Sequence, residues 1–170
     1  MHFRFLLVLL LSAGIGSACT AQPGDSFTLY LVRHAEKQVI EGKDPGLTDA
    51  GNYRSEQLAR WLQDKGVNKI WSSDYQRTRD TAGPLVSKLG LELTLYDPRD
   101  LPDLADKLLE NRENALVVGH SNTTPELTRL LCQCDISDMD ESEYDQLYVV
   151  SVHRGETSVE VLEQSLLFEH

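Results

Sequence analysis

Short apolar runs alternate along the chain with longer amphipathic stretches. The runs at residues 27–32, 69–71, 91–96 and 115–118 have the length and the β-branched or aromatic content of buried strands. The stretches between them carry apolar residues at helical spacing. This alternation predicts an α/β fold, a three-layer α/β/α sandwich with a mainly parallel sheet.

Boundary residues support these predicted elements. Thr48 can cap a helix that ends near Gly66. Further helices are expected over residues 75–89, 102–109 and 125–131, the last capped by Thr124. The runs 147–152 and 157–162 are joined by a short polar turn, which predicts an antiparallel hairpin at the sheet edge. The sequence shows no internal repeat or dividing linker, so residues 22–170 are expected to form one domain.

The first residues have the order of a secretory signal. Arg4 precedes an apolar run at 5–11, which is followed by small residues. The run is too short for a membrane-spanning helix, which needs about 20 residues. We expect residues 1–21 to be a cleaved signal peptide, cut either after Ala21 or before a lipidated Cys19. Either alternative places the protein in the periplasm or anchored by lipid in a bacterial cell envelope.

The net charge limits the partners. Lys and Arg total 16 against 27 Asp and Glu, which gives a formal charge of −11. Such a chain repels nucleic acid and anionic lipid, so we expect no nucleic-acid partner and membrane contact only through a lipid on Cys19. A cluster of cationic side chains stands out against this acidic background.

Two further cysteines, Cys132 and Cys134, follow the last predicted helix. Their separation is tight for a disulfide, so two partly buried thiols and a strained bridge remain alternatives. The sequence near them offers no further His or Cys ligands at metal-binding spacing, and we expect no metal and no cofactor.

Polar and cationic residues follow the predicted parallel strands at their carboxyl ends, where open α/β sheets bind ligands. These are Arg33-His34, Ser72-Ser73 with the later Arg77, Tyr96-Asp97, and Gly119-His120. Two arginines and two histidines at one sheet edge predict a pocket for a phosphoryl dianion.

These residues carry a family resemblance. Residues 31–36 resemble the Arg-His-Gly signature of the histidine phosphatase superfamily, the phosphoglycerate-mutase-like proteins, with Ala35 in place of its glycine. The segments 47–51, 73–82 and 117–120 are similar to its other motifs in order and spacing, so the resemblance covers residues 27–163. It implies that His34 is a nucleophile that becomes phosphorylated. It also implies that the phosphoryl group is bound by Arg33, Arg77, a protonated His120 and the Asn122 turn.

The proton donor is less well marked. Many members of that family use a glutamate shortly after the third strand, whereas this chain offers Asp97 as the first candidate acid and Asp100 as the second. Asp97 before a proline is also a common turn residue, and Asp100 can equally cap the next helix. A weak acid favours phosphoramidates or activated esters, whose leaving groups need little protonation.

The sequence therefore predicts a metal-independent phosphatase that acts on a phosphorylated small molecule or a phosphoprotein. Hydrolysis is preferred to mutase chemistry because no long insertion forms a lid. The alternatives are a phosphohistidine-specific phosphatase and a non-catalytic envelope protein that binds phosphoryl groups.

Overall fold

The computed structural model describes residues 26–39 and 42–168. The expected signal peptide and Cys19 lie outside these residues. Strands and helices alternate as the sequence predicts. In chain order they are β1 (Ser26–Arg33), α1 (Asp49–Leu62), β2 (Lys69–Ser73), α2 (Gln76–Leu89), β3 (Leu93–Tyr96), α3 (Leu101–Asn111), β4 (Ala115–Gly119), α4 (Thr123–Cys132), β5 (Gln146–His153), β6 (Glu156–Glu163) and α5 (Gln164–Leu167).

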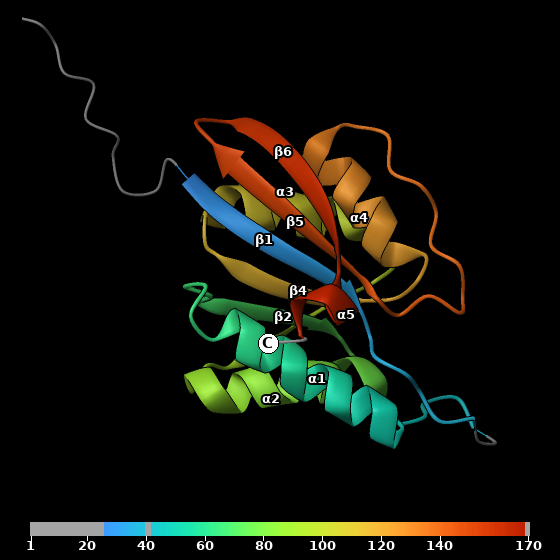
Figure 1. Ribbon diagram of the computed structural model, residues 1–170. Helices are drawn as coiled ribbons and strands as arrows, with labels where there is room; N and C mark the ends of the chain where they lie inside the picture. The colour runs from blue at the N-terminus through green and yellow to red at the C-terminus, as the bar shows by residue number, and fades with distance from the viewer. Residues whose placement is uncertain (1–25, 40–41, 169–170) are drawn as a thin grey trace, which may run out of the picture.

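The strands form one six-stranded sheet in the order β3-β2-β4-β1-β5-β6 (Figure 1). The first four are parallel to one another, whereas β5 pairs with β1 in the antiparallel sense and β6 closes the edge. The register of the central pair sets Arg33 opposite Gly119. The residues that follow these two, His34 and His120, therefore leave the sheet side by side.

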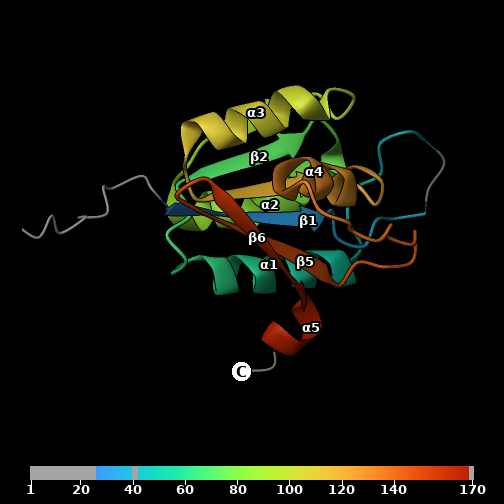
Figure 2. The same ribbon diagram turned by 90° about the horizontal axis from the view of Figure 1, so that it is seen from above.

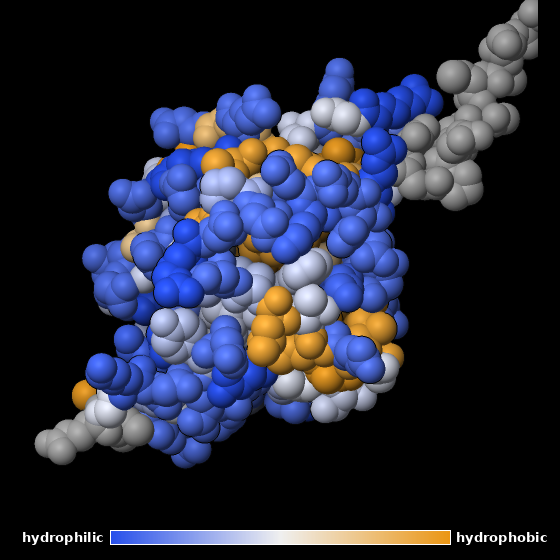
Figure 3. All heavy atoms as spheres, turned by 180° about the vertical axis from the view of Figure 1, so that it is seen from behind, coloured by the Kyte–Doolittle hydropathy of each residue, from blue (hydrophilic) through white to orange (hydrophobic). Residues whose placement is uncertain are grey.

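Helices cover both faces of the sheet, which confirms the predicted three-layer α/β/α architecture. Helices α1 and α2 lie on one face, where Leu58, Leu62 and Leu85 join one apolar cluster. Helices α3 and α4 lie on the other, where Leu104 and Leu127 join the second cluster (Figures 1 and 2). Hydrophilic side chains cover most of the face seen in Figure 3, with apolar side chains in small groups between them. Within residues 26–39 and 42–168, no helix has both the length and the apolar character needed to cross a membrane.

The predicted caps are partly confirmed. Thr48 is the N-cap of α1, and its hydroxyl accepts a hydrogen bond from the Gly51 N–H at 3.1 Å. The prediction for α4 was wrong by two residues, because the helix begins at Thr123 and its N-cap is Asn122. The Thr123 hydroxyl instead accepts from the His120 N–H at 2.9 Å, which starts the helix immediately after the strand.

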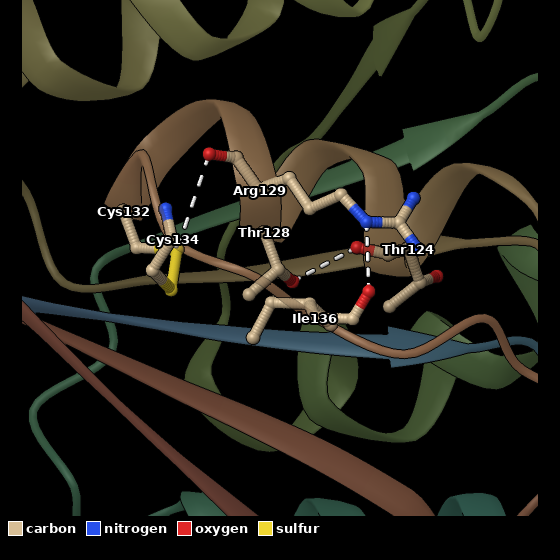
Figure 4. Close-up of a disulfide and its surroundings, with 6 residues drawn as sticks. All are labelled: Thr124, Thr128, Arg129, Cys132, Cys134 and Ile136. Atoms are coloured by element: carbon tan, nitrogen blue, oxygen red, sulfur yellow. Dashed lines mark hydrogen bonds between the residues drawn. A yellow bond between two sulfur atoms is a disulfide. The ribbon is translucent and has the colours of Figure 1, made fainter.

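A disulfide joins Cys132 to Cys134, so the structure has the bridge rather than the two free thiols (Figure 4). It closes the end of α4, where Gln133 adopts a left-handed conformation with φ of 53°. Arg129, one turn earlier, donates from Nε to the Ile136 carbonyl at 2.8 Å. These contacts hold the start of the segment 133–145, which returns the chain to β5.

Candidate active site

Two histidines face each other at the carboxyl ends of the two central strands. His34 follows β1 and His120 follows β4, and their ring centroids are 5.6 Å apart. The parallel register produces this proximity, since the His34 N–H donates to the Gly119 carbonyl at 2.9 Å. The structure therefore brings together the two histidines that the sequence placed 86 residues apart.

The His34 ring is held in one tautomer. Its Nδ1 donates to the carbonyl oxygen of Ala35 at 2.8 Å, and a carbonyl can only accept. Burial, with 2 % of the residue exposed, lowers the pKa of His34 to about 3, and the charges of Arg33 and Arg77 contribute in the same direction. His34 is thus neutral at neutral pH, and its Nε2 carries a free lone pair.

His120 is also neutral in this arrangement. Its Nε2 donates to the Ser73 hydroxyl at 2.9 Å, while Arg77 donates from Nη2 to its Nδ1 at 3.4 Å. Burial, followed by the charges of Arg77 and Arg33, lowers the pKa of His120 to about 4. The protonated form expected from the family resemblance is therefore not the form that the structure favours. A phosphoryl dianion beside the ring would raise its pKa again.

Arg77 points into the same pocket from the first turn of α2. Its guanidinium carbon lies 4.5 Å from the centroid of the Tyr75 ring, and its Nη1 lies 3.6 Å from the Asp44 carboxylate. Its buried Nε has no hydrogen-bond partner among the described residues. Arg77 thus retains donors for an anion, as the sequence predicted.

Arg33 is placed differently from the expectation. Its buried Nη1 donates to the carbonyl oxygens of Asp140, Glu141 and Glu143 at 3.3, 2.8 and 2.7 Å. Its Nη2 donates to the Glu141 carboxylate at 3.1 Å. Arg33 therefore fastens the segment before β5, and only Nη2 and Nε remain for a phosphoryl group. Its role as a phosphoryl ligand stays a prediction.

These groups surround a cavity of about 330 Å³ at the sheet edge. Its lining includes both histidines, Arg77 and the predicted Asn122, but Arg33 does not line it. The remaining lining residues are Lys37, Tyr75, Pro98, Arg99, Ser121, Thr123 and Glu141. The described part of the chain contains no group of three or more His, Cys, Asp or Glu that could hold a metal ion. The pocket is therefore mainly cationic, and it is suited to an anion bound by side chains and by the start of α4.

The family model of the histidine phosphatase superfamily (branch 1) matches residues 29–99, which include His34 and Arg77. A probable phosphoglycerate mutase GpmB from Erwinia tasmaniensis is 35% identical over 91 residues, and its counterpart from Escherichia fergusonii is 39% identical over 90. Over residues 29–99 the chain is therefore similar to the histidine phosphatase superfamily. The two alignments cover 50% and 49% of this chain, and the chain spans only 41% of the length of each of these relatives.

Solved structures show that the chain shares the fold of known phosphatases. The protein histidine phosphatase SixA, complexed with tungstate, superposes with a TM-score of 0.67 at 16% identity, over 83% of this chain and 99% of SixA. The alpha-ribazole phosphatase from Shigella flexneri gives a TM-score of 0.67 at 16% identity, over 81% of this chain and 96% of that enzyme.

The two predicted acids, Asp97 and Asp100, lie outside the cavity lining. The Asp97 carboxylate accepts from the Arg99 side chain at 2.9 and 2.7 Å, and these hydrogen bonds lower its pKa to about 2. Asp100 is the N-cap of α3, where it accepts from the Asp103 N–H at 3.4 Å. Both residues thus adopt the structural roles that the sequence allowed as alternatives. Their assignment as the acid stays a prediction that the geometry does not favour.

Sequence reasoning missed Glu141, which is the carboxylate on the cavity lining within the described residues. It also missed Tyr144, whose ring lies against both Arg33 and His34. Both residues come from the segment 133–145, which has neither strand nor helix periodicity. The one available signal was its density of acidic residues in a chain with a cationic site.

An ion network braces this segment from the other side. The Arg54 guanidinium on α1 donates to both oxygens of the Glu36 carboxylate, at 2.8 to 3.1 Å, and to Asp145 at 2.7 Å. Glu36 lies two residues after His34, and Asp145 directly follows Tyr144. Arg54 thus ties the loop after the candidate nucleophile to the segment that holds Arg33.

Proposed function

We propose that this protein is a histidine phosphatase superfamily member that hydrolyses phosphoryl groups through a phosphohistidine intermediate on His34. The observation that carries the proposal is the state of the His34 ring. It is buried and neutral, its Nδ1 hydrogen is fixed on the Ala35 carbonyl, and the ring lines a mainly cationic cavity. An imidazole in this state is a competent nucleophile towards phosphorus.

The proposed reaction has two displacements. The Nε2 lone pair of His34 forms a bond to phosphorus as the bond to the leaving oxygen breaks. Water then attacks the phosphohistidine, and the N–P bond returns its electron pair to the ring. Negative charge on the transferring group is spread over three oxygens, and Arg77, Lys37 and the N–H groups at the start of α4 can stabilise it there.

Hydrolysis is proposed rather than mutase chemistry. In residues 49–168 the longest connection between successive helices and strands is the 13-residue segment 133–145, which is short for a lid. A mutase must hold its intermediate while it reorients, whereas an open cavity admits water. The similarity to probable phosphoglycerate mutases supports only the broader assignment to phosphoryl transfer.

We propose a phosphorylated small molecule or a phosphoprotein as the substrate. The phosphohistidine-specific alternative is favoured by one observation, which is that Asp97 and Asp100 do not line the cavity. A phosphoramidate leaves without strong acid assistance. A substrate panel of sugar phosphates, phosphoserine peptides and phosphohistidine would distinguish these classes.

A turnover assay tests the proposal against a non-catalytic phosphoryl-binding protein. The mature domain is incubated with p-nitrophenyl phosphate and a chelator, alongside His34→Gln and the matched control His153→Gln, which changes an exposed histidine in the β5–β6 hairpin. We expect turnover by the wild type and the control, and none by His34→Gln. Turnover that survives in His34→Gln would remove the mechanism. Phosphate binding without turnover in the wild type would establish the binding protein.

Export remains part of the proposal. Strand β1 runs from Ser26 to Arg33, so the segment preceding it enters the domain at the edge opposite His34. Expression of the whole chain with Cys19 and with Cys19→Ala, followed by fractionation and mass spectrometry of the N-terminus, distinguishes lipidation from cleavage after Ala21.

A further inference from the structure

Glu141 holds its carboxylate at the mouth of the cavity. One oxygen accepts from Arg33 Nη2 at 3.1 Å, and the other accepts from the Ser121 hydroxyl. The side chain is 74% exposed, so it retains freedom to move. Its backbone does not, because its own carbonyl and those of Asp140 and Glu143 accept from the buried Arg33 Nη1.

We propose that Glu141 is the catalytic acid, which protonates the leaving oxygen while His34 attacks phosphorus. This assignment rests on the proposed phosphatase function and deepens it. It moves the proton donor from the end of β3, where Asp97 lies, to the segment before β5. Within the described residues, Glu141 is the carboxylate that lines the same cavity as the two histidines.

The groups around Glu141 explain how it becomes protonated. The hydrogen bond from Ser121 lowers its pKa in the structure, and the charges of Arg33 and Lys37 act in the same direction. His120 and Arg77 face the same cavity from β4 and α2. A phosphoryl dianion in the cavity competes for the Ser121 hydroxyl, which lines it, and adds negative charge beside the carboxylate. Both effects raise the pKa of Glu141, so substrate binding favours the protonated carboxyl group that can act as the acid.

The step balances in both displacements. As the Nε2–P bond forms, the P–O bond breaks, its electron pair goes to the leaving oxygen, and that oxygen takes the Glu141 proton. The alcohol departs and Glu141 is a carboxylate. The carboxylate then takes a proton from the attacking water as its oxygen bonds to phosphorus and the N–P bond breaks. Inorganic phosphate leaves, and His34 and Glu141 return to their starting states.

Arg33 gains a second function in this arrangement. By donating to three carbonyl oxygens of the segment 133–145, it fixes the backbone from which Glu141 reaches the cavity. A donor must be placed within hydrogen-bond reach of the leaving oxygen, and a fixed backbone with a mobile carboxylate meets that requirement. Arg33 is therefore a positioning residue for Glu141.

Leaving-group dependence tests the assignment. Wild type, Glu141→Gln, Asp97→Asn and the matched control Asp135→Asn are assayed on p-nitrophenyl phosphate and on propyl phosphate. The first ester leaves readily without a proton, whereas the second requires one. We expect Glu141→Gln to lose about 10²-fold to 10³-fold in kcat/KM on propyl phosphate and to stay within about threefold of wild type on the nitrophenyl ester.

Each possible outcome either supports or overturns the assignment of Glu141 as the acid. Asp135 lies exposed on the same segment, so its variant should match wild type on both esters. An equal loss on both substrates in Glu141→Gln, or no loss on either, would overturn the assignment. So would a leaving-group-dependent loss in Asp97→Asn, or a wild type that turns over only the nitrophenyl ester. A wild type inactive on both esters would overturn the phosphatase proposal itself, and the acid with it.

Discussion

The guanidinium carbon of Arg33 lies 4.0 Å from the centroid of the Tyr144 ring. The same ring lies 6.0 Å from the His34 ring, with 58° between the planes. The Tyr144 ring therefore packs against both the buried arginine and the candidate nucleophile. An aromatic face attracts a guanidinium by about 1 to 2 kcal/mol when the pair is partly desolvated.

Substitutions at Tyr144 distinguish the contribution of its aromatic ring to activity from that of its hydroxyl. Tyr144→Phe keeps the aromatic face, and we expect kcat/KM on p-nitrophenyl phosphate within about twofold of wild type. Tyr144→Leu removes the face and loosens Arg33, so kcat/KM should fall about tenfold. Steady-state kinetics, with thermal unfolding to confirm that both variants fold, make the measurement. Equal losses in the two variants would show that the hydroxyl, rather than the ring, matters.

The sequence was sufficient for the parts of the site that regular structure positions. The apolar run that ends at Arg33-His34 and the one that ends at Gly119-His120 predicted adjacent parallel strands. Adjacent parallel strands bring their carboxyl ends together, and the two histidines are 5.6 Å apart as a result. Arg77, in the first turn of a predicted helix, follows from the same logic.

The remaining parts of the site depend on tertiary contacts that leave no periodic pattern in the sequence. Asp97 was placed near the cavity by its position at a strand end, but its side chain turns to Arg99. Glu141 reaches the cavity because Arg33 captures carbonyls of its segment. A loop's path is set by such tertiary contacts, and local propensity does not report them. The pattern of hydrophobic and polar residues therefore could not predict that Glu141 lies in the site.

Gly51 is required by a close approach between α1 and the loop after His34. A Cβ placed on Gly51 would overlap the Glu36 carbonyl oxygen, which is backbone and cannot rotate away. We expect Gly51→Ala to reduce the free energy of unfolding by about 1 to 3 kcal/mol or more, and to lower kcat/KM because the strain falls beside the nucleophile.

Gly83 supplies the matched control for this prediction. It lies inside α2, and a Cβ there meets nothing within 4 Å. Gly83→Ala should therefore raise the free energy of unfolding by about 0.5 to 1 kcal/mol and leave kcat/KM unchanged. Urea denaturation with parallel kinetics measures both variants. Similar stabilities for the two would show that the loop after His34 yields to the added methyl group.

The Cys132–Cys134 disulfide should contribute little to stability. It closes a loop with a sequence separation of 2, and the entropy removed from the unfolded chain grows with loop length. The chain-entropy relation gives roughly 1.5 kcal/mol for so short a loop. Cys132→Ser combined with Cys134→Ser should lose no more than this in denaturant unfolding. It should keep wild-type kcat/KM, because neither cysteine lines the cavity. A large loss of activity on reduction of the wild type would contradict this.

The buried histidines should make stability depend on pH. The pKa of His34 is about 3 and that of His120 about 4 in the folded chain, against 6.5 for an exposed histidine. Between pH 6.5 and 4 the unfolded chain thus binds more protons than the folded chain. The free energy of unfolding falls as the pH falls through this window, and it levels off below the folded pKa values.

The contribution of His34 to this loss of stability can be measured separately. At 1.36 kcal/mol per pH unit, His34 accounts for a loss on the order of 2 kcal/mol in the free energy of unfolding between pH 6.5 and pH 5. The carboxyl groups with lowered pKa, such as Glu141, add most of their losses below about pH 5, because unfolded carboxyl groups are half protonated only near pH 4 to 4.5. His34→Gln removes the titrating ring, so its free energy of unfolding should fall less steeply over the same range. Urea unfolding of both proteins at half-unit pH steps measures the difference. Parallel curves would mean that His34 is hydrated and titrates normally in the folded protein, which would also weaken its assignment as a neutral nucleophile.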